Sequence, residues 1–229
     1  LRPENTASIA RALVSSGKCY EAGPHRLYYS GSMFRHERPQ KGRQREFSQF
    51  GVELVGAKSA AEEVDVISMA YNFLDALTLV DDDTSLLVNT LGDEESRTAY
   101  RTVLMDYFES VKSGLSKDSV ARLERGSVLR ILDSKNKDTQ ALLEDAPTLA
   151  DALCDASRER FEEVQRGLAA LGIPFRLNPR LVRGLDYYSH TAFEITSDQL
   201  GAQATVCGGG RYDGLIGQLG GPQTPAIGW

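Results

Sequence analysis

Alternating polar and apolar positions between residues 33 and 56 predict two strands joined by a loop. In the second strand, Gln49 and Glu53 fall on one parity, whereas Val52 and Leu54 fall on the other. A spacing of two places these two sets on opposite faces of a strand. We therefore expect the apolar set to pack against a core and the polar set to line a pocket.

The loop between these strands is unusually rich in positive charge. It carries five cations within eleven residues, namely Arg35, Arg38, Lys41, Arg43 and Arg45. A charged hairpin loop is often only solvated, and the pattern alone leaves that alternative open. Beside Gln49 and Glu53, however, the loop would give a pocket both cationic and anionic groups. Such a pocket suits a ligand with a phosphate at one end and a hydrogen-bond donor at the other.

Helical periodicity predicts one helix before this hairpin and one after it. Pro3 followed by helix formers, with Asn5 or Thr6 as a cap, predicts a helix that runs to about Ser15. Apolar residues at helical spacing predict a second helix over residues 60–79. Such apolar stripes indicate core packing and not a cofactor site.

The kind of pattern changes twice along the chain. Residues 1–92 combine the hairpin with helices, and strand patterns then disappear over residues 93–171, where helical patterns dominate. Residues 172–229 return to strands and glycines. We therefore expect a strand-rich core in two parts, 1–92 and 172–229, with a helical insertion at 93–171 between them.

The last part contains two further candidate segments. Residues 181–188 place Arg183 and Gly184 beside two tyrosines, and an arginine at a strand end would project into a cleft. Residues 206–214 contain three adjacent glycines, which let the backbone approach a ligand or another strand closely. This triplet matches neither a dinucleotide-binding fingerprint nor a Walker loop, because the flanking spacing and the lysine are missing.

Composition excludes several classes of protein. The chain has 229 residues, 41% of them hydrophobic and 25% charged, and a formal net charge of −6, which together are typical of a globular domain and do not indicate general nucleic-acid binding. No apolar run has membrane-spanning length, and no secretory signal opens the chain. Three widely spaced cysteines predict reduced thiols, a cytoplasmic protein and no structural zinc.

Five motifs together resemble the histidyl-tRNA synthetase family, in that family's order and spacing. They are Leu1-Arg2-Pro3-Glu4-x-Thr6, Phe34 to Arg43 (FRHERPQKGR), Gln49-x-Gly51-x-Glu53, Arg183 to Tyr188 (RGLDYY) and Gly209 to Gly214 (GGRYDG). The resemblance implies an α+β fold, the class II aminoacyl-tRNA synthetase antiparallel sheet flanked by helices, with a helical insertion. It also implies activation of histidine by ATP with Mg²⁺, transfer of the histidyl group to tRNA(His), and a homodimer when full length.

The resemblance assigns a role to each matching residue. For ATP and the reaction, it implies Arg35 at the α-phosphate and the histidine carboxylate, Arg183 at the α-phosphate, and Glu37 and Arg43 at the adenine end and outer phosphate. For histidine, it implies Glu4, Thr6 and Gln49 at the α-amino group, Glu53 and Tyr188 at the imidazole, and Tyr187, Arg211 and Tyr212 around the pocket. Arg35 and Arg183 would be the catalytic pair. Without the resemblance, Glu4 and Thr6 are simple helix caps.

The chain also departs from the family pattern. Asn5 stands where the family usually has glycine, and the first and third class motifs and the anticodon-binding domain are missing from these 229 residues. We therefore expect a fragment with little activity by itself. Two alternatives remain: a regulatory subunit of ATP phosphoribosyltransferase, which shares this core, and a binding protein built on a degraded core. The complete arginine loop and the presence of Arg183 and Glu53 favour the synthetase.

Overall fold

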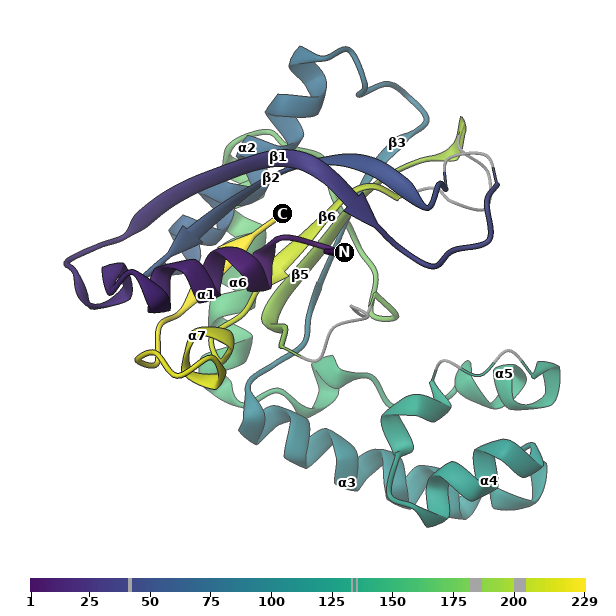
Figure 1. The fold of residues 1–229 in the computed structure, drawn as a ribbon. Coiled ribbons are helices and arrows are strands. Elements are labelled where there is room, and N and C mark those ends of the chain that lie inside the picture. The colour runs from purple at the N-terminus through teal and green to yellow at the C-terminus, as the bar shows by residue number, and fades with distance from the viewer. Residues whose placement is uncertain (41–42, 133, 135, 182–186, 200–204) are drawn as a thin grey trace. The chain divides into compact units, whose positions relative to one another are not determined.

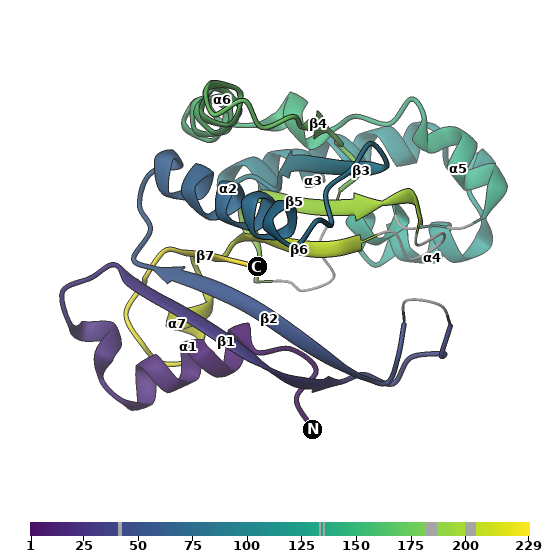
Figure 2. The same cartoon turned by 90° about the horizontal axis from the view of Figure 1, so that it is seen from above.

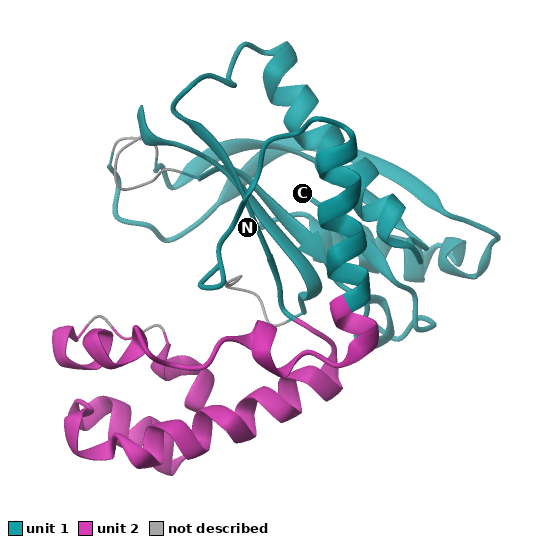
Figure 3. Cartoon of the chain, turned by 180° about the vertical axis from the view of Figure 1, so that it is seen from behind, with its two compact units in different colours: residues 1–91, 159–229 teal, residues 92–158 magenta. Residues whose placement is uncertain are grey.

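The computed structural model describes residues 1–40, 43–132, 134, 136–181, 187–199 and 205–229. The chain forms two compact units (Figure 3). Unit 1 combines Leu1–Leu91 with Glu159–Trp229, and unit 2 is Gly92–Arg158. No helix among the described residues is long and apolar enough to cross a membrane.

Unit 1 is built on a seven-stranded sheet with the order β1-β2-β7-β6-β5-β3-β4 (Figure 1). Its strands are β1 (His25–Phe34), β2 (Glu46–Val55), β3 (Thr84–Thr90), β4 (Arg176–Leu177), β5 (Ser189–Ser197), β6 (Thr205–Arg211) and β7 (Ala226–Gly228). All neighbouring pairs are antiparallel except β3 and β4, which are parallel. The predicted α+β class is confirmed, and the sheet is antiparallel apart from this one edge pair.

The charged hairpin is the β1–β2 pair, whose register runs from His25 opposite Val55 to Phe34 opposite Glu46. Tyr29 lies opposite Gly51, and a Cβ atom at Gly51 would collide with the Tyr29 ring. A glycine is therefore needed for that ring to cross β2. On the other face of β2, Leu54 is buried in the core, whereas Phe50 is 37% exposed and stacks on Phe73.

Helices cover the two faces of the sheet in pairs (Figure 2). α2 (Ala60–Ala76) and α6 (Asp155–Ala170) bury Val64, Ile67 and Leu168 against one face. α1 (Thr6–Ser15) and α7 (Leu215–Gln218) cover the other face, where they form a second buried cluster with the C-terminal end of β2. A short 3₁₀ turn, η1 (Lys18–Tyr20), follows α1.

The start of α2 shows why this helix begins where it does. Ser59 accepts a hydrogen bond from the backbone N–H of Glu62, and the Glu62 carboxylate accepts from the backbone N–H of Ser59 in return. This reciprocal capping box satisfies amide groups that the first turn leaves without helical partners. It also fixes the direction in which the next residue, Glu63, enters the protein interior.

Unit 2 is helical and has its own core, in which Leu104, Phe108 and Ile131 are fully buried. Its elements are α3 (Glu94–Ser110), η2 (Lys112–Gly114), α4 (Lys117–Glu124), η3 (Val128–Ile131), α5 (Lys137–Leu143) and η4 (Leu149–Ala152). The compact unit ends at Arg158, earlier than the expected boundary at residue 171. The reason is that later residues of α6, such as Val164, pack in the core of unit 1.

Candidate functional site

A buried carboxylate, Glu53, is the centre of the candidate site. Its side chain comes from β2 and is only 1% exposed. Thr6 donates its Oγ1 hydroxyl to one carboxylate oxygen at 2.6 Å, and the Tyr212 hydroxyl donates to the other at 2.6 Å. Burial raises the pKa of Glu53 from 4.5 to about 7, although these two hydrogen bonds lower it. The carboxylate thus has two neutral donors and no paired cation among the described residues.

Two glycines in the neighbouring strands leave room for the Glu53 side chain and for a tyrosine ring. Gly228 of β7 lies opposite Glu53, and a Cβ atom there would collide with the Glu53 carboxylate. Gly210 is the β6 neighbour of Gly228, and a Cβ atom at Gly210 would lie 3.0 Å from the Tyr188 ring. Glycine at these positions lets a polar group and an aromatic ring occupy the sheet surface.

Tyrosines line the space beside Glu53. The rings of Tyr187 and Tyr188 lie 4.7 Å apart between centroids, and the Tyr187 and Tyr212 rings lie 5.8 Å apart. Burial is the largest cause that raises the pKa values of Tyr29, Tyr187 and Tyr212 above their ordinary value of 10.0. These hydroxyls therefore stay protonated at neutral pH and can donate hydrogen bonds.

Two further polar side chains belong to this region. The Glu4 carboxylate accepts from the backbone N–H of Ala7 at 3.3 Å, so it also caps α1. The Gln49 Oε1 atom is buried and has no hydrogen-bond partner within the part of the chain that the structure describes. A buried acceptor without a partner loses free energy unless a ligand or water satisfies it.

The arginine loop lies at the other end of the hairpin. Arg35 donates its Nε to the carbonyl of Pro3 at 2.8 Å, and its guanidinium carbon lies 4.8 Å from the centre of the Phe47 ring. Glu37 and Arg43 form an ion pair at 3.0 Å. Two of the residues expected at ATP are thus paired with each other, and Arg35 is held between the N-terminal segment and β2.

Comparison with known proteins shows the family to which the chain belongs. The sequence profile described as histidyl-tRNA synthetase matches residues 1–229. The chain belongs to this family. The histidine–tRNA ligases of Parasynechococcus marenigrum (strain WH8102) and Synechococcus sp. (strain CC9902) are 63% and 62% identical to it over 229 residues. These matches cover 100% of this chain and 52% of each relative, so the chain spans about half the length of the curated relatives it matches.

Solved structures agree with this assignment. The apo histidyl-tRNA synthetase of S. aureus is 36% identical with a TM-score of 0.76, and the match covers 100% of this chain and 54% of that one. A protein from Bacillus halodurans described as an ATP phosphoribosyltransferase regulatory subunit/histidyl-tRNA synthetase is 27% identical, with a TM-score of 0.65 and 61% of its chain covered. This protein is a more distant relative than the two ligases at 62–63% identity and the S. aureus synthetase at 36%.

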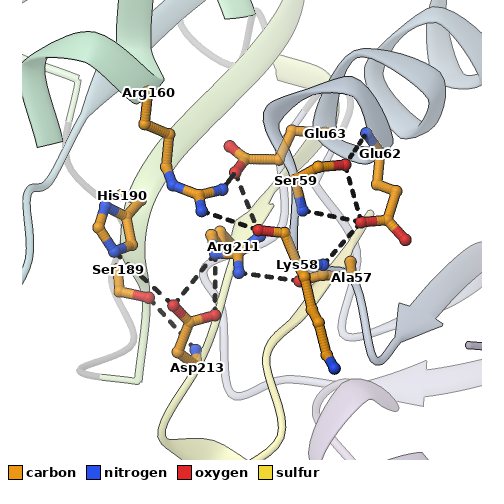
Figure 4. Close-up of polar contacts among 10 residues, drawn as sticks. All are labelled: Ala57, Lys58, Ser59, Glu62, Glu63, Arg160, Ser189, His190, Arg211 and Asp213. Atoms are coloured by element: carbon orange, nitrogen blue, oxygen red, sulfur yellow. Dashed lines mark hydrogen bonds and ion pairs between the residues drawn. The ribbon is translucent and has the colours of Figure 1, made fainter. Parts of the chain in front are cut away.

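Arg211 is the residue that the structure does not bring to the Glu53 group. Adjacent residues at the end of β6 point to opposite faces of the sheet, so Tyr212 reaches Glu53 while Arg211 points toward α2. Arg211 is 3% exposed and is bound to Glu63, the Ala57 carbonyl and Asp213 (Figure 4). The predicted residue Arg183 lies outside the described residues.

Tyr29 is a site residue that the sequence analysis missed. Its ring crosses Gly51 beside Glu53, and its pKa is raised by burial first and by Glu53 second. The signal for it was the glycine on the polar parity of β2. The residue that lies opposite this glycine is known only from the register of the two hairpin strands, which cannot be read from the sequence.

Proposed function

We propose that the protein containing this chain is a histidine–tRNA ligase. It joins histidine to the α-phosphate of ATP with release of pyrophosphate, and then transfers the histidyl group to tRNA(His) with release of AMP. The observation that carries the proposal is the buried Glu53 carboxylate, which is held by Thr6 and Tyr212 and has no paired cation among the residues that the structure describes. The identity of 62–63% to proteins named histidine–tRNA ligase supports the same conclusion.

Glu53 selects the side chain of the amino acid. A ring N–H of histidine donates to the carboxylate, and the tyrosines at 187 and 188 pack around the ring. An amino acid without such a donor would leave a buried carboxylate short of a partner, which is unfavourable. The site therefore discriminates through a hydrogen bond and not through size alone.

The α-amino group of histidine is held by three oxygen acceptors. The Thr6 hydroxyl donates a hydrogen bond to Glu53, and its oxygen keeps lone pairs that can accept from an ammonium group. The Gln49 Oε1 atom offers a buried acceptor, and Glu4 offers a carboxylate near the start of α1. Together these groups orient the amino acid so that its carboxylate points toward the arginine loop.

Arginines stabilise the transition state of activation. A histidine carboxylate oxygen attacks the α-phosphorus, the bond to pyrophosphate breaks, and negative charge grows on the phosphoryl oxygens. The Arg35 guanidinium uses Nε for Pro3, which leaves its two terminal nitrogens for the α-phosphate and the histidine carboxylate. The resemblance to the family gives Arg183 the role of a second catalytic arginine at the same phosphate. Both arginines act as fixed cations and transfer no proton.

Glu37 and Arg43 bind the adenine end and the outer phosphate of ATP, so their ion pair opens or shifts when the nucleotide binds. Mg²⁺ neutralises the outer phosphates when it is bound. The loop from residue 35 to 45 contains a single carboxylate, Glu37, which is paired with Arg43, so this loop would offer Mg²⁺ no cluster of carboxylate ligands. The protein acts in the cytoplasm as a homodimer.

The test is histidine-dependent exchange of pyrophosphate into ATP by the full-length protein, together with charging of tRNA(His). We expect exchange that requires histidine, and a loss of kcat/KM for histidine of about 10- to 100-fold in Glu53→Gln, as for a hydrogen bond to a charged group. A regulatory subunit would not catalyse exchange. Absence of exchange in the full-length protein would refute the proposed function.

A further inference from the structure

A second buried carboxylate lies on the opposite side of the sheet from Glu53. Glu63 is in the first turn of α2 and is 0% exposed. Its neighbours in α2, Val64 and Ile67, belong to the apolar core. A buried charge in such a place is costly unless it is paired and hydrogen-bonded.

Two guanidinium groups meet at one oxygen of Glu63 (Figure 4). Arg160 of α6 approaches Oε1 at 2.6 Å, and Arg211 of β6 approaches the same atom at 3.1 Å. The other carboxylate oxygen, Oε2, has no hydrogen-bond partner within the described part of the chain. Well-packed apolar residues often stabilise a fold as much as a buried ion pair does. Stability alone therefore gives a weak reason for this arrangement.

Arg211 is fixed from several directions at once. One terminal nitrogen binds Glu63, the other donates to the Ala57 carbonyl at 2.8 Å, and Nε lies 2.9 Å from Asp213. The backbone N–H of Asp213 donates in turn to the Ser189 hydroxyl at 3.2 Å. The planar guanidinium thus ties the end of β6 to the start of α2.

Tyr212 is the next residue after Arg211, and it makes the contact to the candidate histidine site. Its backbone N–H donates to Ala226 at 2.7 Å, and its hydroxyl donates to Glu53 at 2.6 Å. The hydroxyl is at the far end of a long side chain. A small rotation of the strand end therefore displaces it by more than it displaces the backbone, and a short hydrogen bond tolerates little displacement.

We propose that Glu63 is a positioning residue for histidine recognition: it holds the Arg211 guanidinium, which fixes the strand end so that Tyr212 donates to Glu53. Glu63 touches neither substrate, and its effect reaches the pocket through residues 211 and 212. The inference rests on the proposed function, because it assigns Glu53 to the bound histidine. It predicts that the charge of Glu63 affects histidine binding and leaves ATP binding unchanged.

The test is a double-mutant cycle on the full-length protein, with the dissociation constants of histidine and ATP measured separately by calorimetry. We expect Glu63→Gln, which keeps the shape and removes the charge, to weaken histidine binding about tenfold, within the range measured for coupled neighbours. ATP binding should stay within about twofold. In a Tyr212→Phe background the same substitution should have no further effect, since the contact that it acts through is already absent. Arg160→Gln is the matched control, because it removes the other guanidinium and should leave histidine binding unchanged.

Each outcome decides the inference. Unchanged histidine binding in Glu63→Gln would overturn it, and so would effects of Glu63→Gln and Tyr212→Phe that simply add. If Glu63→Gln does not fold, Glu63→Asp takes its place in the cycle, with an expected loss of about threefold that disappears in the Tyr212→Phe background. Absence of histidine binding in the unsubstituted protein would overturn the proposed function together with this inference. Binding in the unsubstituted protein with unaffected variants would overturn only the inference.

Discussion

Glu53 and Glu63 are two glutamates withdrawn from solvent on opposite sides of one sheet, and their partners differ in kind. Glu53 accepts hydrogen bonds from two neutral hydroxyls, those of Thr6 and Tyr212. Glu63 is paired with two guanidinium groups, those of Arg160 and Arg211. The exposed fractions are 1% and 0%, so burial does not distinguish the two carboxylates and the charge of the partners does.

This difference separates a site for a ligand, around Glu53, from an internal brace, which is the ion-paired group of Glu63, Arg160 and Arg211. A buried carboxylate without a paired cation keeps an affinity for a donor, and burial raises the pKa of Glu53 accordingly. A carboxylate already neutralised by arginines has little left to offer a ligand. The two groups meet through Arg211 and Tyr212, adjacent residues whose side chains point to opposite faces.

The largest effect should follow from removing the carboxylate at the brace. Glu63→Ala leaves the buried Arg211 guanidinium without its fully buried counter-charge, and we expect the free energy of unfolding to fall by about 3–5 kcal/mol. Urea denaturation of the full-length protein followed by circular dichroism measures this change. Glu62→Ala is the control, because it removes a half-buried capping carboxylate one residue away and should cost only about 1 kcal/mol. Equal costs for the two variants would contradict the brace.

The next largest effect concerns the ligand side of the comparison. Glu53→Gln should weaken histidine binding by about 10- to 100-fold, because a charged acceptor for the ring N–H becomes a neutral amide. ATP binding should change by less than about twofold, since Glu53 lies at the histidine end of the site. Calorimetric titration of each ligand separates the two effects. A parallel loss of both affinities would mean that the variant disturbs the fold and not one contact.

A smaller effect is expected in the pH dependence of stability. The folded-state pKa of Glu53, about 7, is above its ordinary 4.5, so the folded protein binds more protons than the unfolded chain between these values. The contribution of Glu53 to the free energy of unfolding is therefore most favourable below pH 4.5, and it is lost as the pH rises through 7. The glutamine side chain in the Glu53→Gln variant does not titrate. The free energy of unfolding of this variant, relative to that of the parent, should therefore increase by on the order of 2 kcal/mol from pH 5 to 8. A pH-independent difference would contradict this.

Parts of the fold could be predicted because their signals are local. The alternation in β2 and the periodicity of residues 60–79 gave the hairpin and α2, whose observed bounds are Glu46–Val55 and Ala60–Ala76. The three residues of β7 carry no period of their own and form a strand only because β2 and β6 pair with them. The helical patterns of residues 93–171 include α6, but such a pattern does not tell which core a helix joins.

The candidate site divides in the same way. Parity alone put Gln49 and Glu53 on one face of a strand. Tyr29 required the hairpin register, because it reaches the site across Gly51 from the other strand. Arg211 and Tyr212 were both expected around the histidine pocket, but adjacent strand residues point to opposite faces of the sheet, and only Tyr212 reaches Glu53. Its partner Glu63 is far away in sequence and could be found only from the folded structure.

The smallest effect on stability is expected at the exposed ion pair of the arginine loop. The side chains of Arg43 and Glu37 are 41% and 27% exposed, so Arg43→Ala should change the free energy of unfolding by less than about 1 kcal/mol. The same substitution should weaken ATP binding about tenfold if Arg43 meets the outer phosphate, since one charge-assisted contact is lost. Arg101→Ala is the matched control, because Arg101 is about as exposed as Arg43 and pairs with Glu94 in unit 2, so its loss should leave ATP binding unchanged. An Arg43 variant with normal ATP affinity would place the outer phosphate elsewhere, and the arginine loop would then be a solvated hairpin at this position.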